Sequence, residues 1–358
     1  MRITFLLSSL RLSGGVILVV ELANRLAEQG HTVALVTPRQ SIDAEISQKL
    51  QPAVTVIESN ARLPAGPNPF RLAWLVGSLV RAAPPSDIIV ATHTPTTLPV
   101  LLISWLQRRA RLWLFMDYPE MFRSRPAERT LLRYAPGWFP TVVAISQPLV
   151  DEVRPRTKGQ VTLLRPGLGL TASEAAITPE PHPADWRILY IGDDRPRKGL
   201  CEFVQAMQQV QTHEPHALAV IVCKNTCKIN KEIKYELHIR PDDAALAALY
   251  RGCDLFVSTS WGEGLGYPAL QAMAFGKPVV VADSGGVRDY AIDGVNALIV
   301  PAQNANAVAK AVVTLLEDEA LRARLQRQGR QAAALYDWDA AAVALVHTIE
   351  TLTQAASQ

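Results

Sequence analysis

The sequence predicts an α/β protein made of two Rossmann-like domains, and three observations support this prediction. The chain has 358 residues, of which 49% are hydrophobic, enough for two domains that each bury a core. Short apolar segments alternate with segments of helical character, which is typical of parallel sheets covered by helices on both faces. The alternation stops once, at a proline-rich stretch, and then begins again.

The first domain is predicted over residues 1–165. Its strands are expected at residues 3–7, 31–37, 54–57, 87–91, 111–116 and 142–145. Its clearest helices are expected at residues 16–29, 97–107 and 146–153. Gly30 ends the first of them, because glycine commonly follows a helix C-terminus.

A linker over residues 166–185 separates the two halves, and it contains Pro166, Pro179, Pro181 and Pro183. The second domain is predicted over residues 186–335. Its strands are expected at residues 187–191, 217–222, 255–258, 278–281 and 297–300, and its helices at residues 200–212, 242–251, 268–275 and beyond 305. Ligands of such sheets bind beyond the carboxyl ends of the strands. We therefore expect two domains that face each other across a cleft.

Composition excludes several classes of protein. The apolar content excludes disorder, and four cysteines in so long a chain exclude a disulfide scaffold. No run is long and apolar enough for a transmembrane helix, and no secretory signal is recognised. We therefore expect a reducing, cytoplasmic setting. Cys223 and Cys227 lack a second pair at zinc-site spacing, so they are expected to be core and loop thiols.

Charge is distributed unevenly along the chain. Residues 1–166 hold 19 Lys and Arg against 11 Asp and Glu, a net charge of +8, and the remaining residues hold 17 against 22, a net of −5. Arginines lie beside tryptophans in the basic half, as in Arg71 and Arg81 around Trp74 and in Arg108 near Trp105. This combination suits an anionic membrane surface. Two amphipathic helices with inward tryptophans and solvated arginines explain it equally well.

Two turns of the second half carry the chemistry. Gly192–Gly199 lies between a predicted strand and a helix, and it contains Arg195, Arg197 and Lys198. Cations at the end of a strand suit a diphosphate, although a solvated loop would have the same composition. Trp261–Pro268 is also a strand-to-helix turn, and its glycines let backbone amides approach an anion at the helix N-terminus.

Glu263 in the second turn is an acceptor for hydroxyl groups. A carboxylate would avoid a diphosphate unless a polyol lay between them, so the two turns together indicate an activated sugar. Asp283–Gly286 is a third glycine-rich turn, and by itself it is a weak signal.

The run Glu263–Ala274 is similar to the signature of retaining GT-B glycosyltransferases of the sucrose-synthase and mannosyltransferase family (family 4 type, group 1). Other segments resemble motifs of the same family in the same order: Ser13-Gly14-Gly15 with Gly30-His31, His93-Thr94-Pro95, Arg197-Lys198-Gly199, and Tyr336-Asp337-Trp338. The last resembles a tail helix that crosses back to the first domain, here residues 336–358.

The resemblance implies transfer from a nucleotide-diphosphate sugar to a glycan or lipid-linked acceptor, with retained configuration and without a metal or other cofactor. Lys198 with Arg195 or Arg197 would bind the diphosphate and stabilise it as a leaving group. Glu263 would hold hydroxyls of the donor sugar, and His93 would face the reacting sugar. The remaining donor-binding candidates are Gly14, Gly15, Gly264, Leu265, Gly266 and Gln271, and the acceptor-binding candidates are Asp117 and Tyr118.

Two residues depart from the family pattern. Gln271 stands where the family has a second glutamate, which accepts hydrogen bonds from the ribose. Because neutral acceptors form weaker bonds than charged ones, we expect weaker or altered nucleotide binding. Asp193 stands where many members have the diphosphate arginine, so the choice between Arg195 and Arg197 stays open.

Three other functions also fit parts of the sequence. Gly264–Ala269 matches the G-x-G-x-x-A pattern of dinucleotide-binding dehydrogenases, with Asp283 near the usual spacing. The change at Gln271 would also suit a non-catalytic partner protein, and a sugar-nucleotide epimerase can share the two-domain fold. Asp337-Trp338-Asp339 spells the D-x-D of metal-dependent transferases, but it opens a predicted helix, so we expect it to cap and pack.

Overall fold

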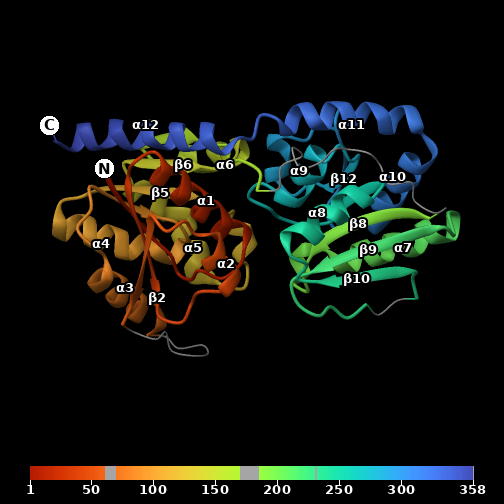
Figure 1. Ribbon diagram of the computed structural model, residues 1–358. Helices are drawn as coiled ribbons and strands as arrows, with labels where there is room; N and C mark the ends of the chain where they lie inside the picture. The colour runs from red at the N-terminus through yellow and green to blue at the C-terminus, as the bar shows by residue number, and fades with distance from the viewer. Residues whose placement is uncertain (61–69, 170–184, 230–231, 358) are drawn as a thin grey trace. The chain divides into compact units, whose positions relative to one another are not determined.

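The computed structural model describes residues 1–60, 70–169, 185–229 and 232–357. The chain divides into two compact units, one formed by Met1–Gly167 with Asp337–Gln358 and the other by Leu168–Tyr336. Each unit is built on a parallel sheet flanked by helices (Figure 1). The predicted fold class, two Rossmann-like α/β domains, is confirmed. Most of the predicted linker, residues 170–184, lies outside the described residues.

The sheet of the first unit has the order β3-β2-β1-β4-β5-β6-β7. Its strands are β1 (Arg2–Leu6), β2 (Thr32–Pro38), β3 (Val54–Ser59), β4 (Ile88–Ala91), β5 (Ala110–Phe115), β6 (Thr141–Ala144) and β7 (Gln160–Leu163). The central strands β4 and β6 are buried along their whole length, which is why they read as continuous apolar runs. The strand order reverses between β1 and β4, and parallel sheets of this kind bind ligands at such a point.

The helices of the first unit are α1 (Gly14–Glu28), α2 (Ala44–Lys49), α3 (Arg71–Ala82), α4 (Thr97–Gln107), α5 (Pro126–Tyr134), α6 (Gln147–Val153) and α12 (Trp338–Ser357). Ser13 caps α1 by accepting a hydrogen bond from the backbone N–H of Val16. Gly30 follows α1 with a φ of 83°, as predicted. The last helix, α12, packs against α1 (Figure 1), and Arg25 of α1 pairs with Asp339 at 2.9 Å.

The second unit has a sheet of order β10-β9-β8-β11-β12-β13. Its strands are β8 (Trp186–Gly192), β9 (Ala217–Cys223), β10 (Tyr235–Ile239), β11 (Leu255–Ser258), β12 (Val279–Ala282) and β13 (Leu298–Val300). Its helices are α7 (Leu200–His213), α8 (Asp243–Gly252), α9 (Tyr267–Ala274), α10 (Ala305–Glu317) and α11 (Glu319–Ala333). A core of aliphatic and aromatic side chains, among them Tyr190, Phe203 and Leu315, lies between β8, β9, α7 and α10.

Two strands escaped the sequence prediction, and both lie at a sheet edge. β7 and β10 each have one neighbouring strand in the described sheets, and their side chains are half-buried or exposed. Edge strands carry polar residues that blunt an open edge. The apolar run on which the prediction depends is therefore missing from them.

The expectation that Cys223 and Cys227 are thiols is wrong. The two residues form a disulfide, with a Cα–Cα distance of 6.7 Å. Cys223 ends β9 and pairs in register with Gly192 at the end of β8, and the chain then returns far enough for Cys227 to reach it. A separation of four residues gave no sign of this return.

Asp337-Trp338-Asp339 caps and packs, as predicted. A side-chain oxygen of Asp337 accepts a hydrogen bond of 2.8 Å from the backbone N–H of Ala340 in the first turn of α12. Trp338 is buried, and Asp339 forms the ion pair with Arg25. These three residues therefore fix the start of α12 on the first unit.

Candidate functional site

The two turns singled out in the sequence leave neighbouring strands of the second unit. β8 and β11 pair in parallel, so their carboxyl ends lie at the same edge of the sheet. The strand order also reverses between these two strands, which makes this edge the place where a parallel sheet binds a ligand. The turn after β8 runs over Asp193–Gly199, and the turn after β11 runs over Thr259–Gly266.

Hydrogen bonds hold the two turns together. The backbone N–H of Trp261 donates to the carbonyl of Arg197 at 2.7 Å, and the hydroxyl of Thr259 donates to the carbonyl of Gly199 at 2.7 Å. Gly199 has a φ of +72°, and a β-carbon there would lie 2.1 Å from the carbonyl oxygen of Thr259. Only glycine fits this close approach, and the approach brings the side chains of both turns into range of each other.

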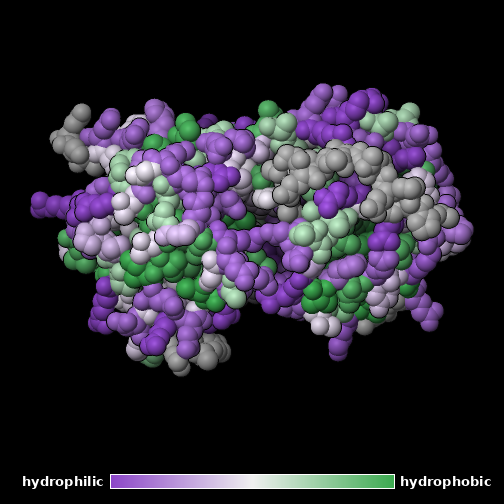
Figure 2. Space-filling view, viewed as in Figure 1, coloured by the Kyte–Doolittle hydropathy of each residue, from purple (hydrophilic) through white to green (hydrophobic). Residues whose placement is uncertain are grey.

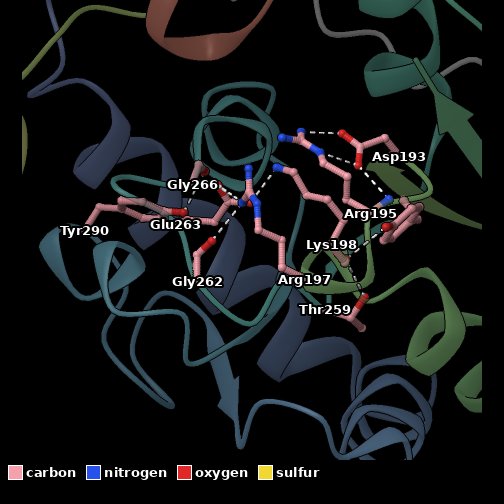
Figure 3. Close-up of polar contacts among 10 residues, drawn as sticks. Asp193, Arg195, Arg197, Lys198, Thr259, Gly262, Glu263, Gly266 and Tyr290 are labelled. Carbon is pink, nitrogen blue, oxygen red and sulfur yellow. Dashed lines mark hydrogen bonds and ion pairs between the residues drawn. The ribbon is translucent and has the colours of Figure 1, made fainter. Parts of the chain in front are cut away.

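Lys198 and Glu263 form an ion pair between the turns (Figure 3). The Nζ–Oε1 distance is 2.6 Å, and each side chain is 15% exposed. Nη1 of Arg197 is 3.8 Å from the other carboxylate oxygen, Oε2 of Glu263. The same nitrogen donates a hydrogen bond of 3.1 Å to the carbonyl of Gly262. Burial raises the pKa of Glu263, but the charges of Lys198 and Arg197 outweigh burial and bring the pKa below its usual value. The carboxylate is therefore ionised at neutral pH.

Arg195 has a different partner. Its guanidinium donates to both carboxylate oxygens of Asp193, with Nε–Oδ1 at 2.8 Å and Nη2–Oδ2 at 2.5 Å (Figure 3). Burial raises the pKa of Asp193, but the hydrogen bonds from Arg195 lower it by a larger amount. The pKa of Asp193 therefore lies below its ordinary value. Of the two arginines left open by the sequence, Arg197 is the one that contacts Glu263.

The glycines after Glu263 shape the start of α9. Gly266 is the N-cap of α9 with a φ of 90°, and a β-carbon there would lie 2.9 Å from the Tyr290 hydroxyl. That hydroxyl donates to the carbonyl of Gly266 at 2.9 Å. Gly264 and Leu265 are buried between Glu263 and this cap. The segment thus places an ionised carboxylate beside the positive end of a helix, where anions bind.

Gln271 lies on α9 and contacts Tyr250. The Tyr250 hydroxyl is 3.1 Å from Oε1 of Gln271 and 3.0 Å from the carbonyl oxygen of Pro268. Tyr250 is fully buried, and burial raises the pKa of its hydroxyl. A protonated phenol has one proton to donate, so it serves one of these two acceptors at a time.

The candidate residues of the first unit lie at the carboxyl edge of its sheet. Gly14 and Gly15 follow β1, and His93 follows β4, so both segments flank the point where the strand order reverses. A β-carbon on Gly15 would lie 3.6 Å from Nε2 of His93 and 3.5 Å from the sulfur of Met116. Burial lowers the pKa of His93 to about 4, so its imidazole is neutral at physiological pH.

Asp117 and Tyr118 follow β5 and are half-buried. Because β4 and β5 pair in parallel, the two residues lie at the same edge of the sheet as His93. Across the described ranges, no three His, Cys, Asp or Glu side chains gather closely enough to hold a metal ion.

The chain matches two models of glycosyltransferase domains. Residues 12–170 match the model described as Glycosyltransferase Family 4, and residues 177–332 match the model described as Glycosyl transferases group 1. With the two parallel sheets, these matches define a protein of the GT-B class. The chain belongs to the group 1, family 4 glycosyltransferases.

Curated relatives and solved structures agree with this assignment. A phosphatidyl-myo-inositol mannosyltransferase of Mycobacterium leprae is 31% identical over 182 residues, which cover 48% of this chain and 48% of the relative. A D-inositol 3-phosphate glycosyltransferase of Xylanimonas cellulosilytica is 37% identical over 109 residues, 30% of this chain and 26% of the relative. The chain thus spans about half or less of the length of these relatives.

Two solved structures share the fold over nearly the whole chain. Anabaena HepE in complex with UDP and glucose superposes with a TM-score of 0.78 at 18% identity, covering 98% of this chain and 99% of that one. Sucrose-phosphate synthase from Thermosynechococcus elongatus superposes with a TM-score of 0.78 at 20% identity, covering 99% of each chain. The dehydrogenase alternative loses its basis, because the glycine motif follows β11 and not β8, the strand that opens the second sheet.

Sequence reasoning missed the residues that hold the site in place. Thr259, Tyr190 and Tyr290 each donate a hydroxyl to a backbone carbonyl of a site turn. Tyr190 lies on β8, and Tyr290 lies four residues beyond the third glycine-rich turn. At both positions a buried aromatic residue is most simply interpreted as part of the core. The sequence offered one signal for these contacts, which is the high density of glycines in the site turns. A glycine often marks a place where another group packs closely against the backbone.

Proposed function

We propose that this chain transfers a hexosyl group from a nucleotide-diphosphate sugar to a glycan or lipid-linked acceptor, with retention of the anomeric configuration. The observation that carries the proposal is the ion pair between Lys198 and Glu263, 2.6 Å long and formed across two strand-end turns. In this pair, a cation that suits a phosphate and a carboxylate that suits sugar hydroxyls lie next to each other, at the edge of the sheet where parallel sheets bind ligands.

The diphosphate would bind to Lys198 and Arg197. As the bond between sugar and phosphate breaks, negative charge develops on the leaving phosphate oxygen, and fixed cations at that place lower the barrier. Arginine adds a planar fork and lysine a point charge. These cations supply the positive charge for which other transferases use a metal, so we expect transfer without one. We expect Arg195 to contribute little, because Asp193 holds it.

The donor sugar would lie between the cations and α9. Glu263 would accept hydrogen bonds from sugar hydroxyls, and its low pKa favours the charged form, which accepts more strongly. Backbone amides of Gly264, Leu265 and Gly266 lie at the positive end of α9 and suit oxygen atoms of the same ligand. Gln271 would contact the ribose with a neutral amide.

The first unit would supply His93, Gly14 and Gly15 to the reacting sugar. Gly15 leaves room beside Nε2 of His93, where a β-carbon would lie 3.6 Å from that nitrogen. Asp117 and Tyr118 would contact the acceptor, because they border the same edge of the sheet. The relatives are named a phosphatidyl-myo-inositol mannosyltransferase and a D-inositol 3-phosphate glycosyltransferase. These names support a hydroxyl-bearing acceptor, and the first supports one that is lipid-linked.

We also propose that the acceptor lies at a membrane and that the first unit binds its anionic surface. Large apolar side chains are exposed on α3 and α4 and at the N-terminus of α3: Phe70, Trp74, Leu102, Trp105 and Leu106. α3 packs on α4, and Figure 2 shows hydrophobic surface over these two helices. We call these five residues the α3–α4 patch.

Charge around the α3–α4 patch favours an anionic partner. Residues 70–116 contain five arginines and one acid, Asp87, and Asp87 is paired with Arg2 at 2.7 Å. Arg108 at the end of α4 is exposed. Indoles beside arginines suit the boundary between lipid and water. We expect peripheral attachment through this patch. No described helix has the length and hydrophobicity needed to span a bilayer.

A cytoplasmic location remains our prediction. Cys201 and Cys253 are free thiols, but the disulfide between Cys223 and Cys227 does not favour a reducing compartment. Fractionation of cells that express the protein, with detection in the membrane and soluble fractions at low and high salt, tests both the location and the peripheral attachment.

Donor binding is tested by thermal shift against GDP-, UDP-, dTDP- and ADP-sugars. A ligand at one hundred times its Kd stabilises the folded protein by about 2.7 kcal/mol, so one nucleotide sugar should raise the melting temperature by a few degrees. Lys198→Ala should abolish the rise. Lys234→Ala is the matched control, because Lys234 is also ion-paired at 2.6 Å, with Asp185, but lies outside the two turns.

No rise with any nucleotide sugar, or an equal rise in Lys198→Ala, would overturn the proposal. The stereochemistry is tested separately, by the anomeric proton coupling of the product in NMR. The non-catalytic alternative, which Gln271 motivates, predicts a thermal shift without any turnover.

A further inference from the structure

Thr92, the residue before His93, is buried and lies between His93 and β1. It follows β4, whose last residue pairs in register with Leu6 at the end of β1. The Thr92 hydroxyl is 2.7 Å from the carbonyl oxygen of Leu6 and 3.0 Å from Nδ1 of His93. One oxygen atom thus contacts both a backbone carbonyl and the imidazole ring.

The arrangement of donors and acceptors decides where each proton lies. A carbonyl oxygen only accepts, so the single proton of the Thr92 hydroxyl is directed to Leu6. The hydroxyl can then act only as an acceptor toward Nδ1, and Nδ1 must carry a proton. In a neutral imidazole one nitrogen is protonated and the other accepts, so Nε2 has a free lone pair.

A second threonine fixes the backbone of the same segment. The Thr96 hydroxyl donates to the carbonyl of His93 at 2.7 Å and accepts from the N–H of Thr92 at 3.0 Å. These hydrogen bonds fix the backbone that carries the His93 side chain. Nε2 of the ring lies beside Gly15, 3.6 Å from the position that a β-carbon of Gly15 would take. Among the described residues, no hydrogen bond ends on this nitrogen.

We propose that Thr92 is a positioning residue that holds His93 in the Nδ1–H tautomer, so that Nε2 accepts a hydrogen bond from a hydroxyl of the transferred sugar. The part played by the sugar rests on the proposed function, whereas the tautomer does not. The opposite tautomer would place an N–H at Nε2, which suits a phosphate or carbonyl oxygen. Thr92 thus determines which kind of group His93 can hold.

The tautomer is measured by NMR on the ligand-free full chain labelled with ¹⁵N-histidine. The chain has 7 histidines, and the signals lost in His93→Gln identify the residue. We expect a pyrrole-type shift for Nδ1 and a pyridine-type shift for Nε2 at pH 7. Thr92→Val keeps the shape of the side chain but removes the acceptor, so the Nε2–H form should become populated.

Two variants serve as controls. Thr92→Ser keeps the hydroxyl and should retain the wild-type tautomer. Thr97→Val removes a buried hydroxyl of the same segment that donates to the carbonyl of Thr94 at 2.8 Å and does not touch the ring, so it should also leave the tautomer unchanged. A pyrrole-type Nε2 in the wild type, or an unchanged tautomer in Thr92→Val, would refute the proposal.

Turnover tests the consequence for the reaction. With the donor found in the thermal-shift screen, Thr92→Val should lower kcat about tenfold, and Thr92→Ser should restore most of it. An unchanged kcat in a variant whose tautomer has shifted would refute the role toward the sugar. If the tautomer is as proposed and no nucleotide sugar is turned over, the proposed function fails and the assignment of Thr92 stands.

Discussion

Gly167 lies directly against Trp338. A β-carbon on Gly167 would be 2.4 Å from the backbone nitrogen of Trp338 and 2.4 Å from its indole ring. Gly167 is the last residue of the first unit before the chain leaves it, and Trp338 begins the helix with which the chain returns. The two passages of the chain are therefore packed together on the first unit, and no side chain fits between them.

Gly167→Ala should therefore destabilise the protein. The methyl group would overlap backbone and indole atoms, and overpacking of this kind costs about 1–3 kcal/mol. Chemical denaturation followed by tryptophan fluorescence measures the change. Gly77→Ala is the matched control, because Gly77 lies inside α3 with no atom within 4 Å of its β-carbon position. That variant should be neutral or more stable by roughly 0.5–1 kcal/mol; equal losses in both would contradict the packing argument.

The two arginines of the first turn should differ in their contribution to donor binding. Arg197→Ala should weaken the binding of the nucleotide diphosphate about 10- to 100-fold, the loss expected for a charged hydrogen bond of about 1.5–3 kcal/mol. Arg195→Ala should change it less than about threefold, because a surface ion pair contributes about 0–1 kcal/mol and Asp193 already occupies this guanidinium. Isothermal titration with the diphosphate of the preferred donor measures both. A larger loss in Arg195→Ala would reverse the assignment.

The amide of Gln271 should limit affinity for the nucleotide. In Gln271→Glu, the Tyr250 hydroxyl at 3.1 Å can donate to one carboxylate oxygen and leave the other for the ribose. We expect affinity to rise by a few-fold to about tenfold, the difference of roughly 1 kcal/mol between neutral and charged acceptors. Tyr250→Phe combined with Gln271→Glu controls for the orienting contact. An unchanged Kd in Gln271→Glu would show that this residue does not contact the donor.

His93 should make stability depend on pH. Its pKa is about 4 in the folded protein because of burial, against about 6.5 when unfolded. The unfolded state therefore binds more protons between pH 6.5 and 4, so stability is highest above pH 6.5 and falls as the pH drops to 4. The loss attributable to His93 is at most about 3 kcal/mol.

The contribution of His93 is isolated by comparison with His93→Gln, since carboxylates titrate in the same range. The free energy of unfolding of each protein is measured by denaturant at pH 7, 5.5 and 4.5. The difference between the two proteins should shrink or change sign as the pH falls. A constant difference would mean that the imidazole is not buried in its neutral form.

The α3–α4 patch should bind anionic vesicles. Trp74→Ala with Trp105→Ala should reduce binding to vesicles of phosphatidylglycerol and phosphatidylcholine by more than tenfold at low salt, because the indoles are 54% and 76% exposed and lose apolar contact with the interface. Tyr235→Ala, which removes an exposed aromatic residue of the second unit, should have no effect. Equal binding to neutral vesicles, or no loss in the double variant, would argue against this surface.

Much of the fold and part of the site follow from local sequence. The buried strands and several of the helices that follow them, among them α1, α4 and α7, were predicted within a few residues, because burial imposes apolar runs with recognisable ends. The short helices α2 and α5 were not predicted. The turns with Lys198 and Glu263 were found because each lies between such a strand and a helix. β10 was missed, since an edge strand such as Tyr235–Ile239 has no such run. The contacts of Thr92 and Tyr290 were missed because a hydroxyl that bonds to a backbone carbonyl leaves no trace in spacing.

The sequence by itself determined two parallel α/β sheets, their order along the chain and which residues stand at strand ends. Only the tertiary structure decided which of these residues meet. Lys198 and Glu263 are 65 residues apart and come together because β8 pairs with β11, whereas Arg195 is bound to its near neighbour Asp193 and Cys223 to Cys227. The physical reason is that helices and strands are specified by periodicity within a dozen residues. The pairing of residues far apart in the sequence, such as Lys198 and Glu263, depends instead on strand order, which is set by the packing of the whole sheet. The local pairs at Arg195 and Cys223 depend on the path of the loop that follows each strand.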